Sequence, residues 1–319
     1  MIFVVQGSVM CLGNGLIAAT IASNKYLRRQ KEILLMAGLA MADFVYGTAT
    51  LLAGSLRIDM TLRGVISELV TPWDCMKWPP TALFTVGQQT VGLMMVIISV
   101  DRYIAVSRFS LYRTMGVAYA YKVLSLVVVY AATIVTALFA VSYFLTTRTA
   151  NKTRLCVGPW AAPAWFGTID SGLSSFYGYL SVAIYGAVYY KYRKHFQNSG
   201  ISQLDVTRAR QLATQRRVTV TVGIVAFFTF VFFCTPTAFV SLANYFGVTI
   251  SSTVIYTLTR TNSIVHIFIY LIRQKDVRQA MISLITCSRA SDMHNHAQNF
   301  VPSMRRQIVS TQISTNGGV

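Results

Sequence analysis

The sequence predicts an all-α protein, a bundle of seven membrane-spanning helices, and three observations support this prediction. The chain has 319 residues, of which 54% are hydrophobic and only 12% are charged. That charged share is about half of what a soluble domain carries, too little to cover a soluble surface. Seven apolar stretches are long enough to cross a bilayer core of about 30 Å, which takes roughly 20 helical residues. Lys and Arg residues gather in alternate connections between these stretches.

The third, fourth and sixth of the predicted spans are the most continuously apolar. The fifth is diluted by Gly and Ser and carries Asp170 near its start, but small residues suit close helix packing in lipid, so we retain it. Because the apolar runs are continuous and do not alternate, a β-barrel is disfavoured. The seven spans lie at about 1–23, 32–54, 79–100, 121–146, 166–190, 218–243 and 248–272.

The first span also has the length of a signal peptide. No basic residue precedes its apolar stretch, and the first positive charges follow it, which argues against a signal peptide. Because the span begins at Met1, the sequence leaves open that the outer part of this helix is missing.

The positive charge predicts the orientation in the membrane. Of the 28 Lys and Arg residues, 21 lie in the connections after spans one, three and five and in the C-terminal tail, whereas 6 lie on the other side. The positive-inside rule then places the N-terminus outside and the C-terminus in the cytoplasm of a multi-pass plasma-membrane protein. The net charge of +18 is therefore a topology signal, and no nucleic-acid partner is expected.

Three features fall on the predicted outer face. Asn151 begins the glycosylation sequon Asn151-Lys152-Thr153. Cys75 and Cys156 are candidates for a disulfide, since this face is oxidising during biogenesis. The outer loops are modest, and no large folded ectodomain is expected, which favours a ligand small enough to enter the bundle.

The C-terminal part predicts contact with membrane lipids. Residues 273–286 place apolar side chains on one helical face, as an amphipathic helix on the inner leaflet does. Cys287 is a palmitoylation candidate directly after this helix. The polar residues 287–319 predict a disordered cytoplasmic tail.

Several motifs stand in matching spans, and together they resemble the rhodopsin-like G-protein-coupled receptors over residues 1–286. The resemblance implies a seven-helix receptor domain, an extracellular ligand, a heterotrimeric G protein as partner and no enzymatic activity. The motifs are Gly13-Asn14 in span one, Leu39-Ala40-Met41-Ala42-Asp43 in span two, Asp101-Arg102-Tyr103 ending span three, Phe230 and Pro236 in span six, and Asn262-Ser263 and Tyr270 in span seven. Residues 39–57, 88–113 and 119–122 also resemble nematode serpentine chemoreceptors of the Srsx class.

The sequence departs from the family pattern at two switch motifs. Cys234, in Phe233-Cys234-Thr235-Pro236, stands where the family usually has its switch tryptophan. His266-Ile267-Phe268-Ile269-Tyr270 lacks the proline of the usual NPxxY motif. The base of span six reads Gln215-Arg216-Arg217 and offers no acid to hold Arg102, so we expect a loosely held resting state.

By resemblance, Asp101 holds Arg102 at rest, and the release of Arg102 admits the G protein. The alternative is that this pair merely marks the membrane boundary. Asp43 is a carboxylate inside span two, where an unpaired charge costs on the order of 3 kcal/mol. The family places a sodium ion there, with Asn14, Asn262 and His266 as polar neighbours, and the alternative is a hydrogen-bonded Asp that packs the bundle.

Three residues are candidates for ligand contact within the bundle, together with Cys234. Arg260 lies ten residues before Tyr270, where opsins carry the retinal lysine, and an arginine cannot form that Schiff base. It attracts an anionic ligand group, pairs with Asp170, or extends toward the outer surface. Phe84 stands where amine receptors carry an acidic counter-ion, and Gln88, one turn deeper, hydrogen-bonds either a ligand or a neighbouring helix.

Rival functions are less consistent with the sequence. A transporter is disfavoured because the two halves show no repeat, and the basic inner connections oppose the orientation of insect-type odorant channels. No phosphate-binding glycine loop or metal-spaced His/Cys cluster indicates an enzyme, and no metal site is expected apart from the sodium ion. We therefore expect a chemosensory receptor for a small ligand, with a short-peptide receptor as the main alternative and a ligand-gated channel or transporter behind it.

Overall fold

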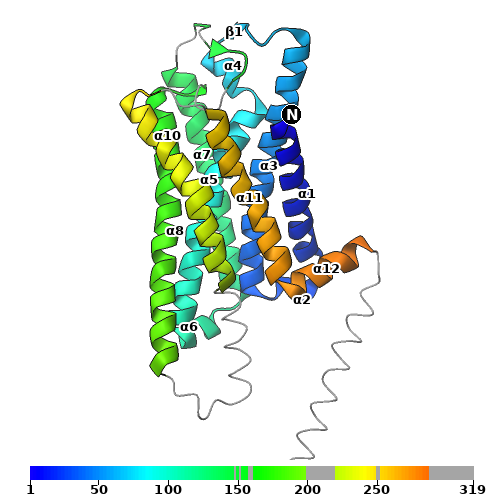
Figure 1. Ribbon diagram of the computed structural model, residues 1–319, viewed down its shortest axis with the longest axis vertical. Coiled ribbons are helices and arrows are strands. Elements are labelled where there is room, and N and C mark those ends of the chain that lie inside the picture. Colours follow the sequence, from blue (N-terminus) through cyan, green and yellow to red (C-terminus); the bar gives the residue numbers. More distant parts are fainter. Residues whose placement is uncertain (147–148, 151, 157–160, 199–219, 249–251, 287–319) are drawn as a thin grey trace, which may run out of the picture.

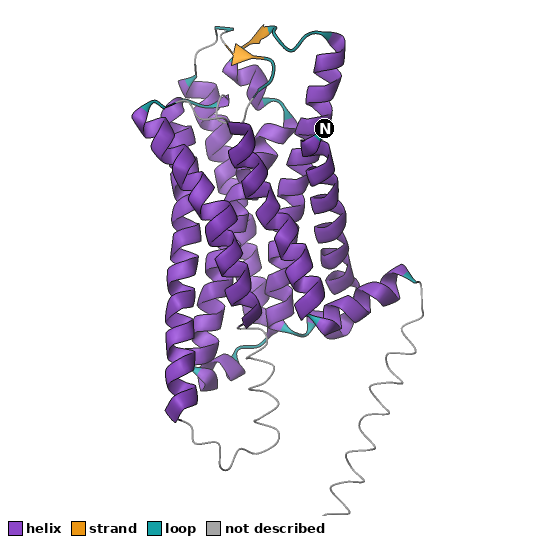
Figure 2. Ribbon diagram, in the orientation of Figure 1, coloured by secondary structure: helices purple, strands orange, loops and turns teal. Residues whose placement is uncertain are grey.

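A computed structural model of the chain is an elongated bundle of long helices that lie side by side (Figure 1). It describes residues 1–146, 149–150, 152–156, 161–198, 220–248 and 252–286. Short elements cap both ends of the bundle, and nearly all of the regular structure is helical (Figure 2). The elements are α1 (Ile2–Ser23), α2 (Lys25–Arg28), α3 (Lys31–Arg63), β1 (Leu69–Val70), α4 (Pro72–Met76), α5 (Pro79–Ser107), α6 (Phe109–Thr114), α7 (Val117–Leu145), β2 (Lys152–Thr153), α8 (Ala164–Asn198), a helical stretch over 220–229, η3 (Phe230–Cys234), α10 (Thr235–Phe246), α11 (Ser252–Arg273) and α12 (Lys275–Ile285).

Five helices among the described residues are long and apolar enough to cross a membrane. They correspond to the first, second, third, fourth and sixth predicted spans, and are Ile2–Ser23, Lys31–Arg63, Pro79–Ser107, Val117–Leu145 and Val220–Ala243. The helices at the fifth and seventh predicted spans, α8 and α11, are 35 and 22 residues long and are not among the five. Both carry many Ser, Thr and Gly residues, which lower their hydropathy.

Two helices extend well past the predicted spans. α3 continues nine residues beyond position 54, and α5 continues seven beyond position 100. The predicted spans stop where the apolar run stops, whereas the backbone hydrogen-bond ladder continues through polar and charged residues. α3 ends at Gly64, whose left-handed backbone (φ 72°) lets its N–H and that of Val65 satisfy the last carbonyls of the helix.

The end of the bundle that carries the N-terminus also carries the paired strands (Figure 1). A disulfide joins Cys75 of α4 to Cys156, 81 residues later. The strands β1 and β2 pair antiparallel, with Leu69 opposite Thr153. Together these contacts hold residues 152–156 against this end of the bundle.

The short helix α4 begins with a capping box. The backbone N–H of Asp74 donates to the Thr71 hydroxyl at 3.1 Å, and the Asp74 carboxylate accepts from the Thr71 backbone in return. The hydrogen bond from the Thr71 hydroxyl, followed by that from Lys77, lowers the pKa of the Asp74 carboxyl below its ordinary value. The cap therefore orients the helix that carries Cys75.

The opposite end carries α2, α6 and α12 (Figure 1). α12 lies within the predicted amphipathic segment, packs Val277 into the bundle at 1% exposure and leaves Leu284 and Ile285 exposed. Cys287, the tail 287–319 and Asn151 lie outside the described residues.

Candidate functional site

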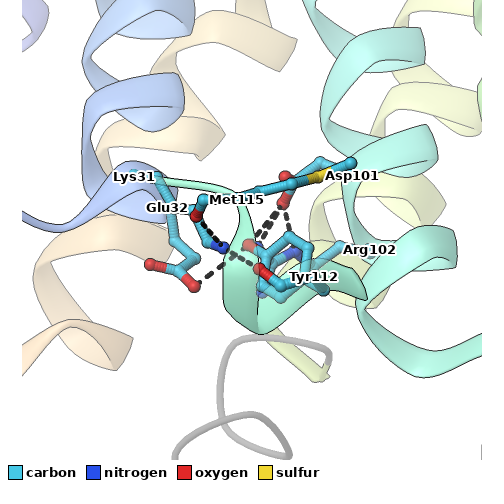
Figure 3. Close-up of polar contacts among 6 residues, drawn as sticks. All are labelled: Lys31, Glu32, Asp101, Arg102, Tyr112 and Met115. Atoms are coloured by element: carbon cyan, nitrogen blue, oxygen red, sulfur yellow. Dashed lines mark hydrogen bonds and ion pairs between the residues drawn. The ribbon is translucent and has the colours of Figure 1, made fainter. Parts of the chain in front are cut away.

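A buried ion pair lies at the end of α5 (Figure 3). Arg102 and Asp101 are 2% and 1% exposed. The Arg102 Nε donates to Asp101 Oδ2 at 3.0 Å, and Nη2 contacts the same oxygen. A charge taken out of water in this way is tolerated because its opposite charge is next to it. The structure thus brings together the two residues predicted as a latch.

Tyr112 of α6 covers this pair. Its hydroxyl accepts a hydrogen bond from Arg102 Nη2 at 2.7 Å and lies 3.1 Å from Asp101 Oδ2 and 3.0 Å from Glu32 Oε1. Burial, reinforced by the Asp101 and Glu32 carboxylates, raises the pKa of Tyr112. The hydroxyl therefore stays protonated and donates a hydrogen bond to one of the two carboxylates.

Lys31 and Glu32, at the start of α3, hold α6 in place (Figure 3). The Lys31 Nζ donates to the carbonyls of Tyr112 and Met115, the latter at 2.8 Å, and lies 3.5 Å from the centroid of the Tyr112 ring. A cation at a helix C-terminus also meets the negative end of the helix dipole. We call Lys31, Glu32, Asp101, Arg102 and Tyr112 the inner clasp.

The sequence reasoning missed three members of the inner clasp. Tyr112 lies 80 residues after Glu32, and no local spacing signals that the two meet. Tyr103, the third residue of the predicted motif, lies outside the clasp, and Lys191 Nζ of α8 lies 4.5 Å from the centroid of its ring. Gln215, Arg216 and Arg217, at the base of span six, lie outside the described residues. Within the clasp, Arg102 has a second partner besides Asp101, the Tyr112 hydroxyl.

A polar network in the middle of the bundle is centred on Asp43, which is fully buried. Its Oδ1 accepts from Ser263 at 2.5 Å, and its Oδ2 lies 2.9 Å from His266 Nδ1. The His266 Nε2 lies 3.3 Å from Thr229, whose hydroxyl donates to Asn262. The network therefore joins α3, α11 and the helical stretch over 220–229.

Asn14 of α1 is fully buried but makes no side-chain hydrogen bond, and it is not hydrogen-bonded to Asp43. Each Asp43 oxygen keeps a second lone pair, and the Asn14 amide oxygen has no partner. Such oxygen atoms are suitable ligands for a hard cation. The residues present therefore fit a sodium ion.

A π-helical turn interrupts the sixth span just before Pro236. Proline lacks an N–H and its ring clashes with the carbonyl four residues earlier, which disrupts the α-helical ladder. Here the turn η3 covers Phe230–Cys234, and the Thr235 N–H donates to the Phe230 carbonyl five residues back. Such turns are frequent at functional sites.

The side chains around this turn point to neighbouring helices. The Phe230 ring packs edge-on against Tyr179 of α8, with centroids 5.8 Å apart. Cys234 is fully buried, and a Cβ on Gly178 of α8 would lie 2.2 Å from its Sγ. Tyr270 is 3% exposed, with its ring 6.3 Å from that of His266. Cys234 was predicted to contact ligand, but it does not line the cavity described next, because its sulfur packs against α8.

A cavity of about 140 Å³ lies at the other end of the bundle from the inner clasp. Phe84, Gln88 and Arg260 all line it, as predicted ligand contacts would. Gln88 also donates to Ser174 of α8 at 3.2 Å. The wall combines aromatic rings with a few polar groups, the usual composition of a small-molecule site.

Arg260 is the main buried charge of this cavity, at 4% exposure. Its guanidinium lies 4.2 Å from the Phe3 ring centroid and 5.3 Å from that of Phe84. It forms no ion pair with Asp170, whose carboxylate accepts instead from Gln89 at 2.7 Å. The burial excludes an Arg260 that extends to the surface, and the Asp170 pairing is not formed.

A family of known proteins matches most of the chain. The family model described as "7 transmembrane receptor (rhodopsin family)" matches residues 13–273. No curated protein matches the chain. The matched range includes Asp43, the whole inner clasp and all the cavity residues named above except Phe3. The chain therefore belongs to the rhodopsin family of seven-transmembrane receptors.

Proposed function

We propose that this protein is a chemosensory receptor that binds a small extracellular ligand and activates a heterotrimeric G protein. Seven helices cross the plasma membrane, with the N-terminus outside and the C-terminus in the cytoplasm. The family is one of receptors and not of enzymes. The Srsx-like stretches at 39–57 and 88–113 support the chemosensory assignment, and the side that carries most Lys and Arg supports the orientation.

One observation carries the proposal: a single helix, α5, lines the cavity at one end and holds a buried ion pair at the other. Phe84 and Gln88 line the cavity, and Arg102 follows Gln88 by 14 residues, about 21 Å along the helix. A ligand that moves α5 or its neighbours at the cavity therefore acts on the same rigid rod that carries Arg102.

The coupling needs two states of the bundle. In the resting state the inner clasp holds Arg102, and in the active state Arg102 is released toward the G protein. A ligand shifts this equilibrium only by its difference in affinity for the two states. The π-helical turn beside Pro236 and the Asp43 network, which would hold a sodium ion, lie between the two ends and are the elements that we expect to rearrange.

A G-protein dissociation assay in cultured cells tests the proposal, with mixtures of small volatile and water-soluble compounds as stimuli. Arg102→Ala is compared with wild type at matched surface expression, and Arg108→Ala, an exposed arginine at the end of the same helix, is the matched control. A response in wild type and Arg108→Ala that is lost in Arg102→Ala supports the proposal. A response of equal size in Arg102→Ala contradicts the clasp mechanism, and a ligand-gated current without G-protein dissociation favours the channel alternative.

A further inference from the structure

Two arginines face the cavity without an acidic partner. Arg260 comes from α11 and is 96% buried, and Arg57 comes from α3 and is half-buried. The Nε of Arg57 and the Nε and Nη1 of Arg260 are buried without any hydrogen-bond acceptor. A buried donor left unpaired carries the full cost of its desolvation. A hydrogen-bond acceptor bound next to these groups would offset that cost.

The two guanidiniums share one neighbour, the Phe3 ring. Both central carbons are within 5.4 Å of the centroid of the Phe3 ring, which both approach. The two cations also repel each other. Like charges gathered in a low-dielectric site are costly unless a counter-charge is present.

The cavity wall carries fewer acidic than basic groups. Its one acid, Asp170, is hydrogen-bonded to Gln89. Among the described residues, neither Arg57 nor Arg260 takes part in an ion pair. Even with the Asp170 carboxylate counted, the two arginines leave a surplus positive charge in the wall, which an anion entering the cavity would balance.

The rest of the wall constrains what enters. Phe84, Phe166 and Tyr256 supply aromatic rings, and Leu138, Val240 and Ile255 supply aliphatic groups. The volume of about 140 Å³ is close to that of an apolar cavity that holds benzene, about 150 Å³. Three unpaired donor atoms match the two oxygens of a carboxylate, which offer about four lone pairs.

We propose that the cavity binds a small organic carboxylate, whose oxygens are held by Arg57 and Arg260 while its apolar part packs against the aromatic wall. This inference rests on the proposed receptor function, because it names the ligand class of that receptor. It predicts that recognition depends on the negative charge and on both arginines.

Direct binding to purified receptor in lipid nanodiscs tests the inference without a G protein. The probes are hexanoate and benzoate, each compared with its uncharged amide, and the readout is the shift in unfolding temperature as a function of probe concentration. We expect a saturable rise with a carboxylate and none with the matching amide. Equal shifts by acid and amide would overturn the inference, as would no shift by either acid up to about 10 mM, since that range detects millimolar affinity.

Four variants assign the binding to the two arginines. Arg260→Gln and Arg57→Gln should weaken carboxylate binding by roughly 10- to 100-fold, as expected for the loss of a charge-assisted hydrogen bond. Arg260→Lys retains the charge and should keep part of the affinity. Arg63→Gln is the matched control, because Arg63 lies six residues after Arg57 on the same helix but is exposed and paired with Asp59. Unchanged affinity in Arg260→Gln would contradict the inference.

The unfolding temperature of the unliganded receptor shows whether each variant is correctly folded. Because Arg57 and Arg260 repel each other, removing either charge should leave the unfolding temperature of the unliganded receptor unchanged or raise it. A large fall in both variants would mean that the arginines stabilise the fold and do not await a ligand, which overturns the inference.

The failures of the two proposals are distinguishable. Carboxylate binding that is lost in Arg260→Gln but never dissociates a G protein would refute the receptor function and leave the carboxylate site. A G-protein response to an uncharged compound that persists in Arg260→Gln would refute the carboxylate site and leave the receptor function.

Discussion

The Tyr112 hydroxyl is the part of the inner clasp whose removal should most selectively weaken the resting state. Tyr112→Phe deletes one hydrogen bond accepted from Arg102 at 2.7 Å and one donated to the Glu32 or Asp101 carboxylate at about 3 Å. The ring remains and still covers Lys31 and Arg102, at 3.5 and 5.6 Å from its centroid. The change is therefore confined to polar contacts of the clasp.

The expected effect follows from the energy of those contacts. A hydrogen bond to a charged group contributes about 1.5–3 kcal/mol, and water or the neighbouring charges replace part of it in the variant. A net loss of about 2 kcal/mol from the resting state raises the ratio of active to resting receptor about thirtyfold. Ligand-free G-protein dissociation should therefore rise above wild type at equal surface expression.

The assay compares Tyr112→Phe with wild type and with Tyr121→Phe, which removes the hydroxyl of an exposed tyrosine on α7. Tyr121→Phe should match wild type. Basal dissociation that is unchanged in Tyr112→Phe would refute the reasoning. A value below wild type would mean that the hydroxyl stabilises the active state.

Three further predictions concern stability. Gly178→Ala should lower the unfolding temperature, because its Cβ would lie 2.2 Å from Cys234 Sγ and overpacking costs about 1–3 kcal/mol. The double variant with Cys234→Ala should recover most of the lost stability. If the double variant recovers none of it, the clash is not the cause. Thr71→Ala should destabilise the receptor by about 1 kcal/mol through the lost cap, measured against Thr61→Ala, which lies on exposed α3 surface. Because the cap keeps the pKa of Asp74 low, this contribution is present above the ordinary Asp pKa and shrinks as the pH falls through the lowered value. Exchange of sodium for choline should lower the unfolding temperature of wild type but not of Asp43→Asn, and equal shifts in the two proteins would exclude a sodium ion at Asp43.

Much of the bundle can be read from the sequence, because a chain in lipid must satisfy its backbone polar groups internally and so forms helices. The apolar runs locate α1, α3, α5, α7 and the helix over Val220–Ala243. The ends of the helices cannot be predicted in this way. Hydropathy marks only the apolar part of a helix, whereas the backbone hydrogen bonds of α3 continue to Arg63.

The candidate sites divide in the same way. The sequence alone identified Asp101, Arg102, Asp43 and Arg260, because a charge within or beside an apolar run is unusual wherever the chain folds. It could not identify their partners. Tyr112, Glu32 and Arg57 are ordinary polar residues in their local context, and only the tertiary structure brings Tyr112 onto the ion pair and Arg57 beside the ring that Arg260 covers. The physical reason is that the energy of a charge depends on what lies within a few ångströms of it in space, and that distance is set by packing between segments far apart along the chain.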